Sequence, residues 1–413
     1  MSPSAGASQQ GGRIQKLGDA FDLLAAYSEG GFLFERAGSG VSASAPMVAT
    51  APLAFARRML ADVDRAIDGG GRTVAVGTIP FREVGGTSTL SVAARSVRRT
   101  APGETVRIDV GDDVVAPSEG SFARMFGRTP GSIPREPFTG RQLDAIPPPD
   151  GYAAAVAEVV RRLDAGLRKV VLARTIEVDA GRELDGRRLA HRLRAVNPDA
   201  FTFVTPTTAG ILVGASPELL VSRFGREVRS NPLAGSAARS GDPDEDRANA
   251  DALLASAKDR EEHAIVVEWI ARALRPFCRE LTWDPAPTLL ETPNVWHLST
   301  RFRGLLLEPS PDVLELVETL HPTPAVAGDS REAALEVIRE LEPFDRGSYA
   351  GPVGWMDASG DGEWAIALRC AELRGDRATL YAGAGIVAGS QPDAEVDETE
   401  RKFRAFLDAL RWG

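Results

Sequence analysis

The sequence predicts an α+β fold in which the strands pair antiparallel. Segments with strand signals follow one another across short turns such as Ser359-Gly360-Asp361-Gly362, and segments with helix signals are inserted between these runs. Strict alternation of strand and helix, which would predict a parallel sheet, does not describe this order. The chain has 413 residues, of which 43% are hydrophobic and 26% charged, so it can bury the core of one large domain or of two ordinary ones.

The N-terminal third of the chain has the weaker signals. Residues 1–20 are predicted to be a disordered leader, because residues 1–12 are small and polar and lack the apolar segment of a secretory signal. Residues 21–149 are predicted to form an N-terminal portion that ends in a linker or long surface crossover at Asp113–Pro149, which is rich in Gly, Pro and Ser. The predicted elements of this portion are a helix at Pro52–Ile67 and strands at Thr73–Phe81, Leu90–Arg99 and Thr105–Val110.

From residue 150 to residue 413 the signals are sharper, and this segment is predicted to form the second portion of the fold. Helices are predicted at Tyr152–Leu163, Arg187–Val196, Asp246–Leu274, Val313–Leu320, Arg331–Leu341 and Ala394–Leu410. Strands are predicted at Lys169–Val178, Phe201–Thr205, Ile211–Ala215, Leu219–Phe224, Val295–Leu305, Tyr349–Met356, Trp364–Leu373 and Thr379–Val387.

Charge and composition exclude several classes of function. The formal net charge of −10 argues against a general nucleic-acid binder, which would present a basic face. Cys278 and Cys370 are far apart and the four histidines are scattered, so neither a disulfide framework nor a zinc cluster is indicated. No apolar run is long enough to span a bilayer, and we therefore expect a cytoplasmic protein with no membrane partner.

One glycine motif resembles a dinucleotide fingerprint. Gly383-Ala384-Gly385 follows a predicted strand and precedes a helix, but the third glycine comes one place late at Gly389 and no second strand follows. A loop whose bare amides approach an anion closely fits this motif better.

Two pairs of carboxylates on predicted helices could bind a metal. Asp259 and Glu262 are spaced i, i+3, as are Glu395 and Glu398, and Lys402 follows Glu398 by four residues, so each pair shares one helix face. Each face alone is equally well explained as a solvated surface. Brought together, the two pairs would form an oxygen-only site that suits a hard cation such as magnesium.

Three further charged residues lie in apolar surroundings. Lys169 opens a predicted strand, where it is either a solvated edge residue or, facing an enclosed site, a base. Glu218 is either a strand-end carboxylate or a functional acid. Arg369 lies between Leu368 and Cys370, so its guanidinium is either ion-paired or holds a ligand carboxylate through two parallel hydrogen bonds.

Seven sequence blocks, in order, resemble the chorismate-utilising enzymes, a family of anthranilate synthase large subunits, aminodeoxychorismate synthases, salicylate synthases and isochorismate synthases. The blocks are Lys169–Arg174, Gly214–Leu219, Pro232–Ser236, Lys258–His263, Tyr349–Trp355, Gly383–Val387 and Glu395–Thr399. The resemblance covers the chain well from Gly151 to the C-terminus and thinly before it. The stretch His321–Ala325 is similar to the isochorismate synthase form, because salicylate synthases tend to have threonine where Ala325 falls.

The resemblance implies a fold and a reaction. The fold would have two large antiparallel sheets packed face to face, with helices outside and the site between the sheets in residues 150–413. The activity would be magnesium-dependent isomerisation of chorismate to isochorismate, for siderophore or menaquinone synthesis, by addition of water at C2 and loss of the C4 hydroxyl. The lysine that matches Lys169 would activate the water, and the glutamate that matches Glu218 would protonate the leaving hydroxyl.

The resemblance also implies how the remaining site residues bind metal and substrate. Glu262 and Glu398 would carry the magnesium ion, and Asp259 and Glu395 would hold its waters. Arg369 and Tyr349, with the amides of Ala384 and Gly385, would bind the enolpyruvyl carboxylate. The other expected substrate-binding residues are Gly235 and Ser236 near the ring carboxylate, His297 and Ala325 near the ring, and Lys402.

Three alternatives stay open at the level of the sequence. A salicylate synthase would share these residues and would also eliminate pyruvate. A non-catalytic regulator that binds magnesium or an anion would not need both Lys169 and Glu218, and a metal-dependent phosphatase could use the carboxylates alone. The expected partner is chorismate, with no nucleic acid and no glutaminase subunit, and the expected oligomeric state is a monomer.

Overall fold

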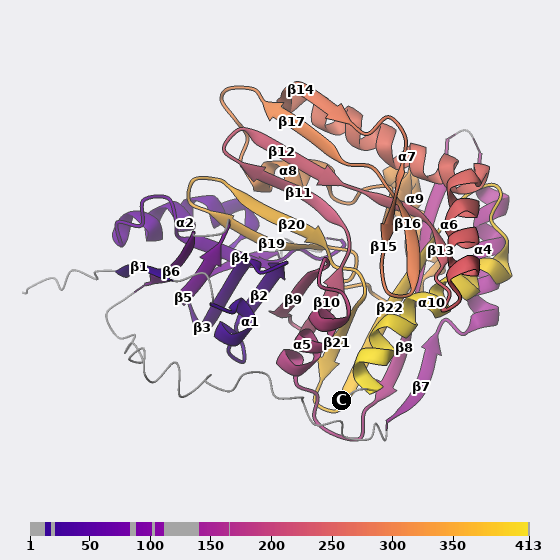
Figure 1. The fold of residues 1–413 in the computed structure, drawn as a ribbon, viewed down its shortest axis with the longest axis horizontal. Helices are drawn as coiled ribbons and strands as arrows, with labels where there is room; N and C mark the ends of the chain where they lie inside the picture. The colour runs from indigo at the N-terminus through magenta and orange to yellow at the C-terminus, as the bar shows by residue number, and fades with distance from the viewer. Residues whose placement is uncertain are drawn as a thin grey trace, which may run out of the picture.

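The computed structural model describes residues 13–17, 21–82, 88–100, 104–110, 140–164 and 166–411. Every strand pairing among these residues is antiparallel, as the sequence predicts. The strands form one 19-stranded network and a separate three-stranded sheet, and helices cover them from outside (Figure 1). The predicted α+β class is confirmed.

Most strands belong to a first layer that runs through both portions of the chain. Its neighbouring strands, from one edge to the other, are β1 (Arg13–Leu17), β6 (Thr105–Asp109), β5 (Thr89–Arg99), β3 (Ser39–Pro52), β2 (Phe32–Arg36), β9 (Phe201–Pro206), β10 (Ile211–Ser216), β21 (Cys370–Arg374), β22 (Arg377–Ile386) and β8 (Lys169–Asp179). Beyond β8 the edge is formed by two short strands, β7 (Arg141–Ile146) and β18 (Gly328–Asp329).

A second layer packs against the first. Its neighbouring strands are β4 (Val74–Thr78), β19 (Pro352–Asp357), β20 (Gly362–Ile366), β11 (Leu219–Phe224), β12 (Glu227–Asn231), β17 (Phe302–Leu306) and β14 (Cys278–Trp283). The two layers are joined by hydrogen bonding where Val76 of β4 faces Ser91 of β5. The resemblance implies two large antiparallel sheets packed face to face, and the structure has them as two layers joined at one edge.

Alternation along the strands places side chains in two cores. Phe32 and Phe34 of β2 belong to the larger core, together with Trp355 of the second layer. Leu33, between them, belongs to a smaller core that also contains Leu189 from a helix. Since successive strand residues point to opposite faces, the first layer buries one face against the second layer and the other against helices.

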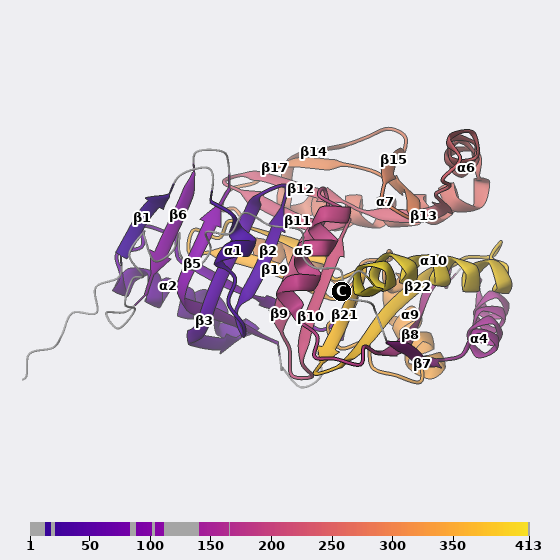
Figure 2. The same cartoon turned by 60° about the horizontal axis from the view of Figure 1, so that its bottom comes forward.

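Helices cover the outer faces and the ends of the layers. On the first layer α1 (Leu23–Ala26), α5 (Gly186–Val196) and α10 (Pro392–Arg411) cover the smaller core (Figure 2). The other helices are α2 (Leu53–Ala66), α4 (Pro149–Arg162), α8 (Val313–Leu320) and α9 (Arg331–Leu341), together with α6 (Pro243–Ala255) and α7 (Ala257–Leu274), which pack on the three-stranded sheet. That sheet consists of β13 (Leu233–Ala238), β16 (Val295–Ser299) and β15 (Thr288–Glu291).

Three predicted elements are each divided in two. The helix predicted at Asp246–Leu274 breaks at Ser256, whose backbone is extended and whose hydroxyl accepts a hydrogen bond from the amide of Asp259 (3.2 Å), so it caps α7. The strand predicted at Val295–Leu305 becomes β16 and β17, which lie in different sheets. The strand predicted at Trp364–Leu373 becomes β20 and β21, which lie in different layers.

The predicted leader and linker both contain a strand. Arg13–Leu17 of the predicted leader is β1, paired with β6, and the rest of residues 1–20 lies outside the described residues. Arg141–Ile146 of the predicted linker is β7, paired with β8, and residues 113–139 lie outside the described residues. Both predictions are wrong where strands form, because pairing with a neighbouring strand compensates for weak local signals.

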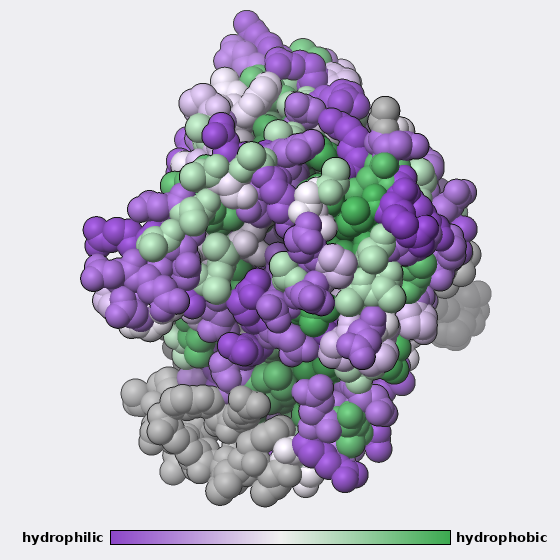
Figure 3. All heavy atoms as spheres, turned by 90° about the vertical axis from the view of Figure 1, so that its right-hand side faces the viewer, coloured by the Kyte–Doolittle hydropathy of each residue, from purple (hydrophilic) through white to green (hydrophobic). Residues whose placement is uncertain are grey.

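In the part of the chain that the structure describes, no helix has the length and apolar character needed to cross a membrane. On the face seen in Figure 3, hydrophobic side chains lie in separate patches between hydrophilic ones.

Candidate active site

The site lies where two chain segments cross between the layers. β10 passes into β11 through Pro217 and Glu218, and β20 passes into β21 through residues 367–369. The crossings are hydrogen-bonded to each other, since the amide of Ile366 donates to the carbonyl of Glu218 (3.1 Å) and that of Ala215 to the carbonyl of Arg369 (3.2 Å). One carboxyl and one guanidinium are thereby fixed side by side on the rigid frame of the sheet.

A cavity opens at these crossings. One wall comes from the three-stranded sheet and α7, and the opposite wall from β22, α10 and the crossings. The predicted site residues that line it are Glu218, Gly235, Ser236, Glu262, His297, Ala325, Tyr349, Arg369, Gly385, Glu398 and Lys402.

Four predicted site residues do not line the cavity. Lys169 is fully buried behind the wall. Asp259 packs against the lining residue Gly235, where an added Cβ would lie 3.0 Å from its own, and Glu395 pairs with Lys258. The side chain of Ala384 is part of the larger core, whereas its neighbours Gly383 and Gly385 line the cavity, so a contact of Ala384 with a ligand through its backbone amide stays a prediction.

Lys169 reaches the cavity through Glu262. Its Nζ lies 2.9 Å from Oε1 of Glu262, which does line the cavity. Gly385 makes this meeting possible, because a Cβ there would lie 2.1 Å from Oε1 of Glu262 and 2.8 Å from Cε of Lys169. Only glycine therefore fits between the lysine, the glutamate and the β22 backbone.

Glu218 is held in its neutral form. Burial raises the pKa of its carboxyl to about 8, although a backbone hydrogen bond from Leu233 and the positive charges of Lys169 and Arg369 act in the opposite direction. A carboxyl that keeps its proton at neutral pH can donate it to a reacting group. Because the charge of Lys169 acts on Glu218, the two residues share one electrostatic environment.

Arg369 and His297 form a polar pair inside the cavity. Arg369 has φ of +50°, a left-handed backbone conformation that is uncommon for a residue with a side chain, and it is enforced by the crossing. Its Nη2 lies 2.9 Å from Nε2 of His297. Burial and the nearby Arg369 hold the pKa of His297 well below its usual value, so the imidazole is neutral and Nε2 accepts the guanidinium hydrogen. The pair leaves the arginine charge available to an anion.

Tyr349 continues the same wall. Its ring is buried and stacks on that of Tyr381, with centroids 5.0 Å apart and an interplanar angle of 12°. Burial raises the pKa of the Tyr349 hydroxyl, so it remains a hydrogen-bond donor at neutral pH. A donor beside a guanidinium suits a carboxylate ligand.

Two carboxylates at or beside the cavity have lysine partners. Lys402 Nζ contacts Glu398 Oε1 at 2.5 Å and donates to the carbonyl of Gly383 at 2.7 Å. Lys258 Nζ contacts Glu395 Oε1 at 2.7 Å. Burial opposes ionisation of Glu398, but Lys402 holds the pKa of its carboxyl below the usual value.

Two further carboxyls resist ionisation. Burial and the negative charge of Glu398 raise the pKa of Glu395. Burial, with Glu262 and Glu398 nearby, raises the pKa of Asp259. Asp259 thus senses the negative charge of Glu262 and Glu398, and Glu395 that of Glu398, and a cation placed among these carboxyls would relieve the repulsion.

The donor set fits a magnesium ion held by Glu262 and Glu398. Among the described residues, no three His, Cys, Asp or Glu side chains are placed to hold a metal together. Magnesium, however, usually takes one or two protein carboxylates and completes its shell with waters and substrate oxygens. Glu262 and Glu398 are the two carboxylates of the predicted metal set that line the cavity.

Several lining residues escape prediction from the sequence. They are Val171, Pro217, Leu233, Ala234, Val326, Arg346, Ala350, Leu368 and Gly383. Arg346 is the charged member of this set, and its spacing of i, i+4 from Glu342 is that of an ordinary surface pair. A run of apolar residues around such a pair would be the signal to look for, and here it is absent from the sequence.

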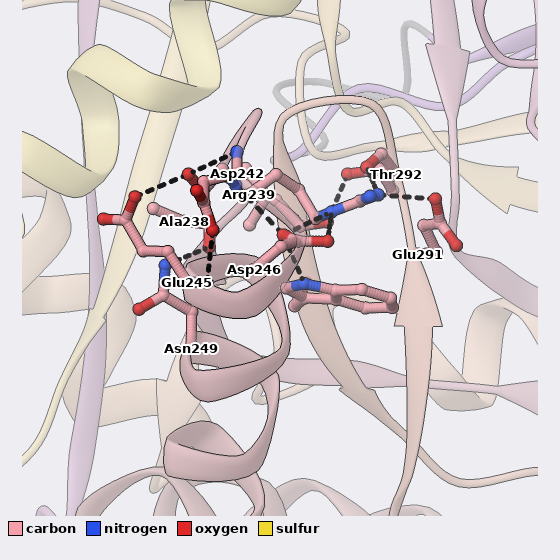
Figure 4. Close-up of polar contacts among 11 residues, drawn as sticks. Ala238, Arg239, Asp242, Glu245, Asp246, Asn249, Glu291 and Thr292 are labelled. Atoms are coloured by element: carbon pink, nitrogen blue, oxygen red, sulfur yellow. Dashed lines mark hydrogen bonds and ion pairs between the residues drawn. The ribbon is translucent and has the colours of Figure 1, made fainter.

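A polar network outside the cavity anchors the wall that carries Gly235 and Ser236. Arg239, just after β13, contacts Asp246 of α6 (2.8 Å) and Glu291 of β15 (2.6 Å), and Figure 4 shows it reaching between these elements. Its guanidinium also lies 4.4 Å above the ring of Trp296. The network therefore ties the end of β13 to α6 and to β15.

Comparison with known proteins assigns residues 131–411 to a family model described as "Chorismate binding enzyme". Isochorismate synthase DhbC of Bacillus subtilis is 46% identical over 276 residues, which cover 65% of this chain and 69% of that protein. The vibriobactin-specific isochorismate synthase of Vibrio cholerae is 42% identical over 270 residues, which cover 65% of this chain and 68% of that protein.

A solved structure extends the likeness to nearly the whole chain. The crystal structure of DhbC from Bacillus anthracis superposes with a TM-score of 0.79 at 35% sequence identity and covers 95% of this chain and 99% of that one. The N-terminal portion, where the sequence resemblance is thin, thus also has the fold of the Bacillus anthracis protein.

Proposed function

Because this chain belongs to the chorismate binding enzyme family, we propose that it is a magnesium-dependent isochorismate synthase, an isomerase that converts chorismate to isochorismate. The observation that carries the proposal is the joint placement of Lys169 and Glu218, a buried amine and a carboxyl that keeps its proton, around a cavity that also contains Arg369. The names of the similar curated proteins and of the similar solved structure support it.

The reaction moves a hydroxyl group around the ring without changing the number of waters. Water attacks C2, the two ring double bonds shift, and the C4 hydroxyl leaves as a second water once it receives a proton. A base must take a proton from the attacking water and an acid must protonate the departing oxygen.

Lys169 and Glu218 fill these two roles in the proposal. In its neutral form Lys169 accepts a proton from the water, and Glu218 donates its own proton to the C4 oxygen. Each turnover leaves a proton on the amine and removes one from the carboxyl, and exchange with solvent restores both. Since Glu218 holds its proton to about pH 8, the acid is ready at neutral pH.

The substrate carboxylates are bound by two different groups. Arg369 and Tyr349 hold the enolpyruvyl carboxylate, while Gly235 and Ser236 lie by the ring carboxylate. A magnesium ion on Glu262 and Glu398 would offset the charge of the ring carboxylate. Lys402, bound to Glu398, keeps that carboxylate ionised and able to hold the cation.

The decisive experiment is incubation with chorismate and magnesium, followed by chromatography for isochorismate, salicylate, pyruvate and anthranilate. Isochorismate as the sole product is expected. Salicylate with an equal amount of pyruvate would instead support the salicylate synthase alternative. No product at all would support the non-catalytic regulator, for which the structure offers no separate observation.

Removal of the metal is expected to abolish turnover, and added magnesium to restore it, because the ring carboxylate would otherwise face Glu262 and Glu398 directly. The measurement is the rate of isochorismate formation with a chelator and then with excess magnesium. Glu398→Gln is the matched variant, since it keeps the shape of the side chain and should raise the magnesium concentration needed for half-maximal rate. An enzyme that ignores the chelator would contradict the metal site.

A monomeric state, the lack of a glutaminase partner and the choice between siderophore and menaquinone synthesis stay predictions of the sequence.

A further inference from the structure

The strand that carries Lys169 has a gap along one edge. β8 pairs with β22 over its length on one side, but on the other it pairs with β18 only at Lys169 and Val170 and with β7 only from Thr175 onward. Residues 171–174 therefore face no strand on that side. Unpaired backbone groups in a buried edge are costly, so other groups must satisfy them.

In this gap the amide of Val171 donates to the carbonyl of Ala327 (2.8 Å), and two side chains bind other backbone groups. Arg346 Nη2 donates to the carbonyl of Val171 (2.7 Å), and the amide of Ala173 donates to Glu342 Oε1 (2.8 Å). Glu342 and Arg346 are joined to each other, since Nε of the arginine donates to Oε2 of the glutamate at 2.9 Å and Nη2 contacts Oε1 at 2.5 Å. The pair therefore supplies hydrogen bonds that a neighbouring strand would otherwise give to this part of β8.

The same guanidinium holds two other walls of the cavity. Its Nη1 donates to the carbonyl of Val326 (2.8 Å), next to Ala325. Its Cζ lies 4.2 Å from the ring centroid of Phe81, and the backbone carbonyl of Arg346 accepts a hydrogen bond from the amide of Tyr349 (2.9 Å). Arg346 is 1% exposed and itself lines the cavity, so these contacts are made without competing water.

We propose that the buried Glu342–Arg346 pair is the positioning device of the active site, which sets Lys169, Ala325 and Tyr349 relative to one another. The inference rests on the proposed function and adds to it two residues that act through others. Lys169 is two residues before the Val171 carbonyl that Arg346 holds, Ala325 precedes the Val326 carbonyl, and the ring centroid of Tyr349 lies 6.0 Å from Cζ of the guanidinium. A shift of the guanidinium would move the base, the ring contact and the carboxylate ligand together.

The test is Arg346→Lys, which keeps the charge but cannot hold three partners in one plane. Turnover should fall by about 10²-fold, the size of effect expected for a displacement of about 1 Å, while KM for chorismate changes much less. The matched control is Arg194→Lys, which removes the same planar group from the buried Glu35 beneath α5, with Arg194 Nη1 at 2.8 Å from Oε1. The control should lose a similar amount of thermal stability and keep its turnover.

Glu342→Gln provides a second variant that changes no side-chain length. If the pair acts as a unit, the double variant Glu342→Gln with Arg346→Lys should lose no more turnover than the worse single variant. If Arg346→Lys does not fold, Glu342→Gln replaces it in the test. Its turnover and melting temperature are then compared with those of Arg194→Lys in the same way.

The outcomes separate this inference from the proposed function. A wild-type enzyme that makes no isochorismate contradicts the proposed function and the inference with it. An active wild type whose Arg346→Lys variant melts earlier but turns over normally contradicts the inference alone, because the pair would then only stabilise the fold.

Discussion

The Lys169→Met variant is expected to bind chorismate yet to form isochorismate about 10²–10⁴-fold more slowly than the wild-type enzyme. Methionine fills the volume of the lysine stem, which is fully buried (0% exposed). What is lost is the amine 2.9 Å from Glu262, the group proposed to take a proton from water. The measurements are the rate of product formation and the dissociation constant of chorismate.

Lys258→Met is the matched control for that experiment. Lys258 also pairs with a carboxylate of the cluster, at 2.7 Å from Glu395, but it does not line the cavity. The control also removes an amine paired with a carboxylate, but not the proposed base, so most of the turnover should remain. Near-normal turnover of Lys169→Met, or equal losses in both variants, would show that the lysine only balances charge.

The fold could be predicted where strand alternation is strong and hydrophobic. The strand at Lys169–Val178 and those at Phe201–Thr205 and Ile211–Ala215 were expected almost to the residue, because buried branched and aromatic side chains dominate them. β12 and β13 were missed, since Glu227–Asn231 is polar and Leu233–Ala238 is mostly small. Their pairing with β11, β17 and β16 is a tertiary property that local signals do not carry.

The sequence contains an N-cap signal for the break between α6 and α7 that hydrophobic periodicity does not reveal. Ser256 lies three residues before Asp259, which is the spacing between a helix N-cap and the residue whose amide donates a hydrogen bond to it. Hydrophobic periodicity continues across it, so periodicity alone predicts one helix. The break matters for the site, because it lets α7 begin just before Asp259 and point Glu262 into the cavity.

The site residues were predicted from the family blocks, and the structure shows why spacing could not replace that resemblance. Glu262, Glu398 and Arg369 come from α7, α10 and a layer crossing, and they meet only through long-range packing. Strand alternation predicts that the Ala384 side chain points away from those of its glycine neighbours, and its expected role belongs to its backbone amide. Arg346 was missed because a buried ion pair and a surface pair have the same spacing along the chain.

The second large effect is expected for Glu218→Gln, which cannot donate a proton and should slow isochorismate formation by about 10²–10⁴-fold. Its pH dependence is the more specific test. Wild-type turnover should fall as pH rises through about 8, because burial raises the pKa of Glu218 to that value and the acid is lost above it. The slow residual turnover of Glu218→Gln should lack this fall, and a variant that keeps it would assign the alkaline loss to another group.

The pH dependence of protein stability tests the protonation of Glu218 independently of catalysis. In the folded wild type Glu218 holds its proton up to about pH 8, whereas in the unfolded chain it ionises near its ordinary pKa of 4.5. Between these values only the folded state binds the proton, so the free energy of unfolding contributed by this group decreases as pH rises. Glutamine has no such proton, and the melting temperature of Glu218→Gln relative to wild type should therefore climb over this interval and level off above pH 8. Glu363, whose pKa burial raises to about 7, is present in both proteins and cancels from the difference. A constant difference in melting temperature would mean that Glu218 is already ionised in the folded enzyme, and it could not then be the acid.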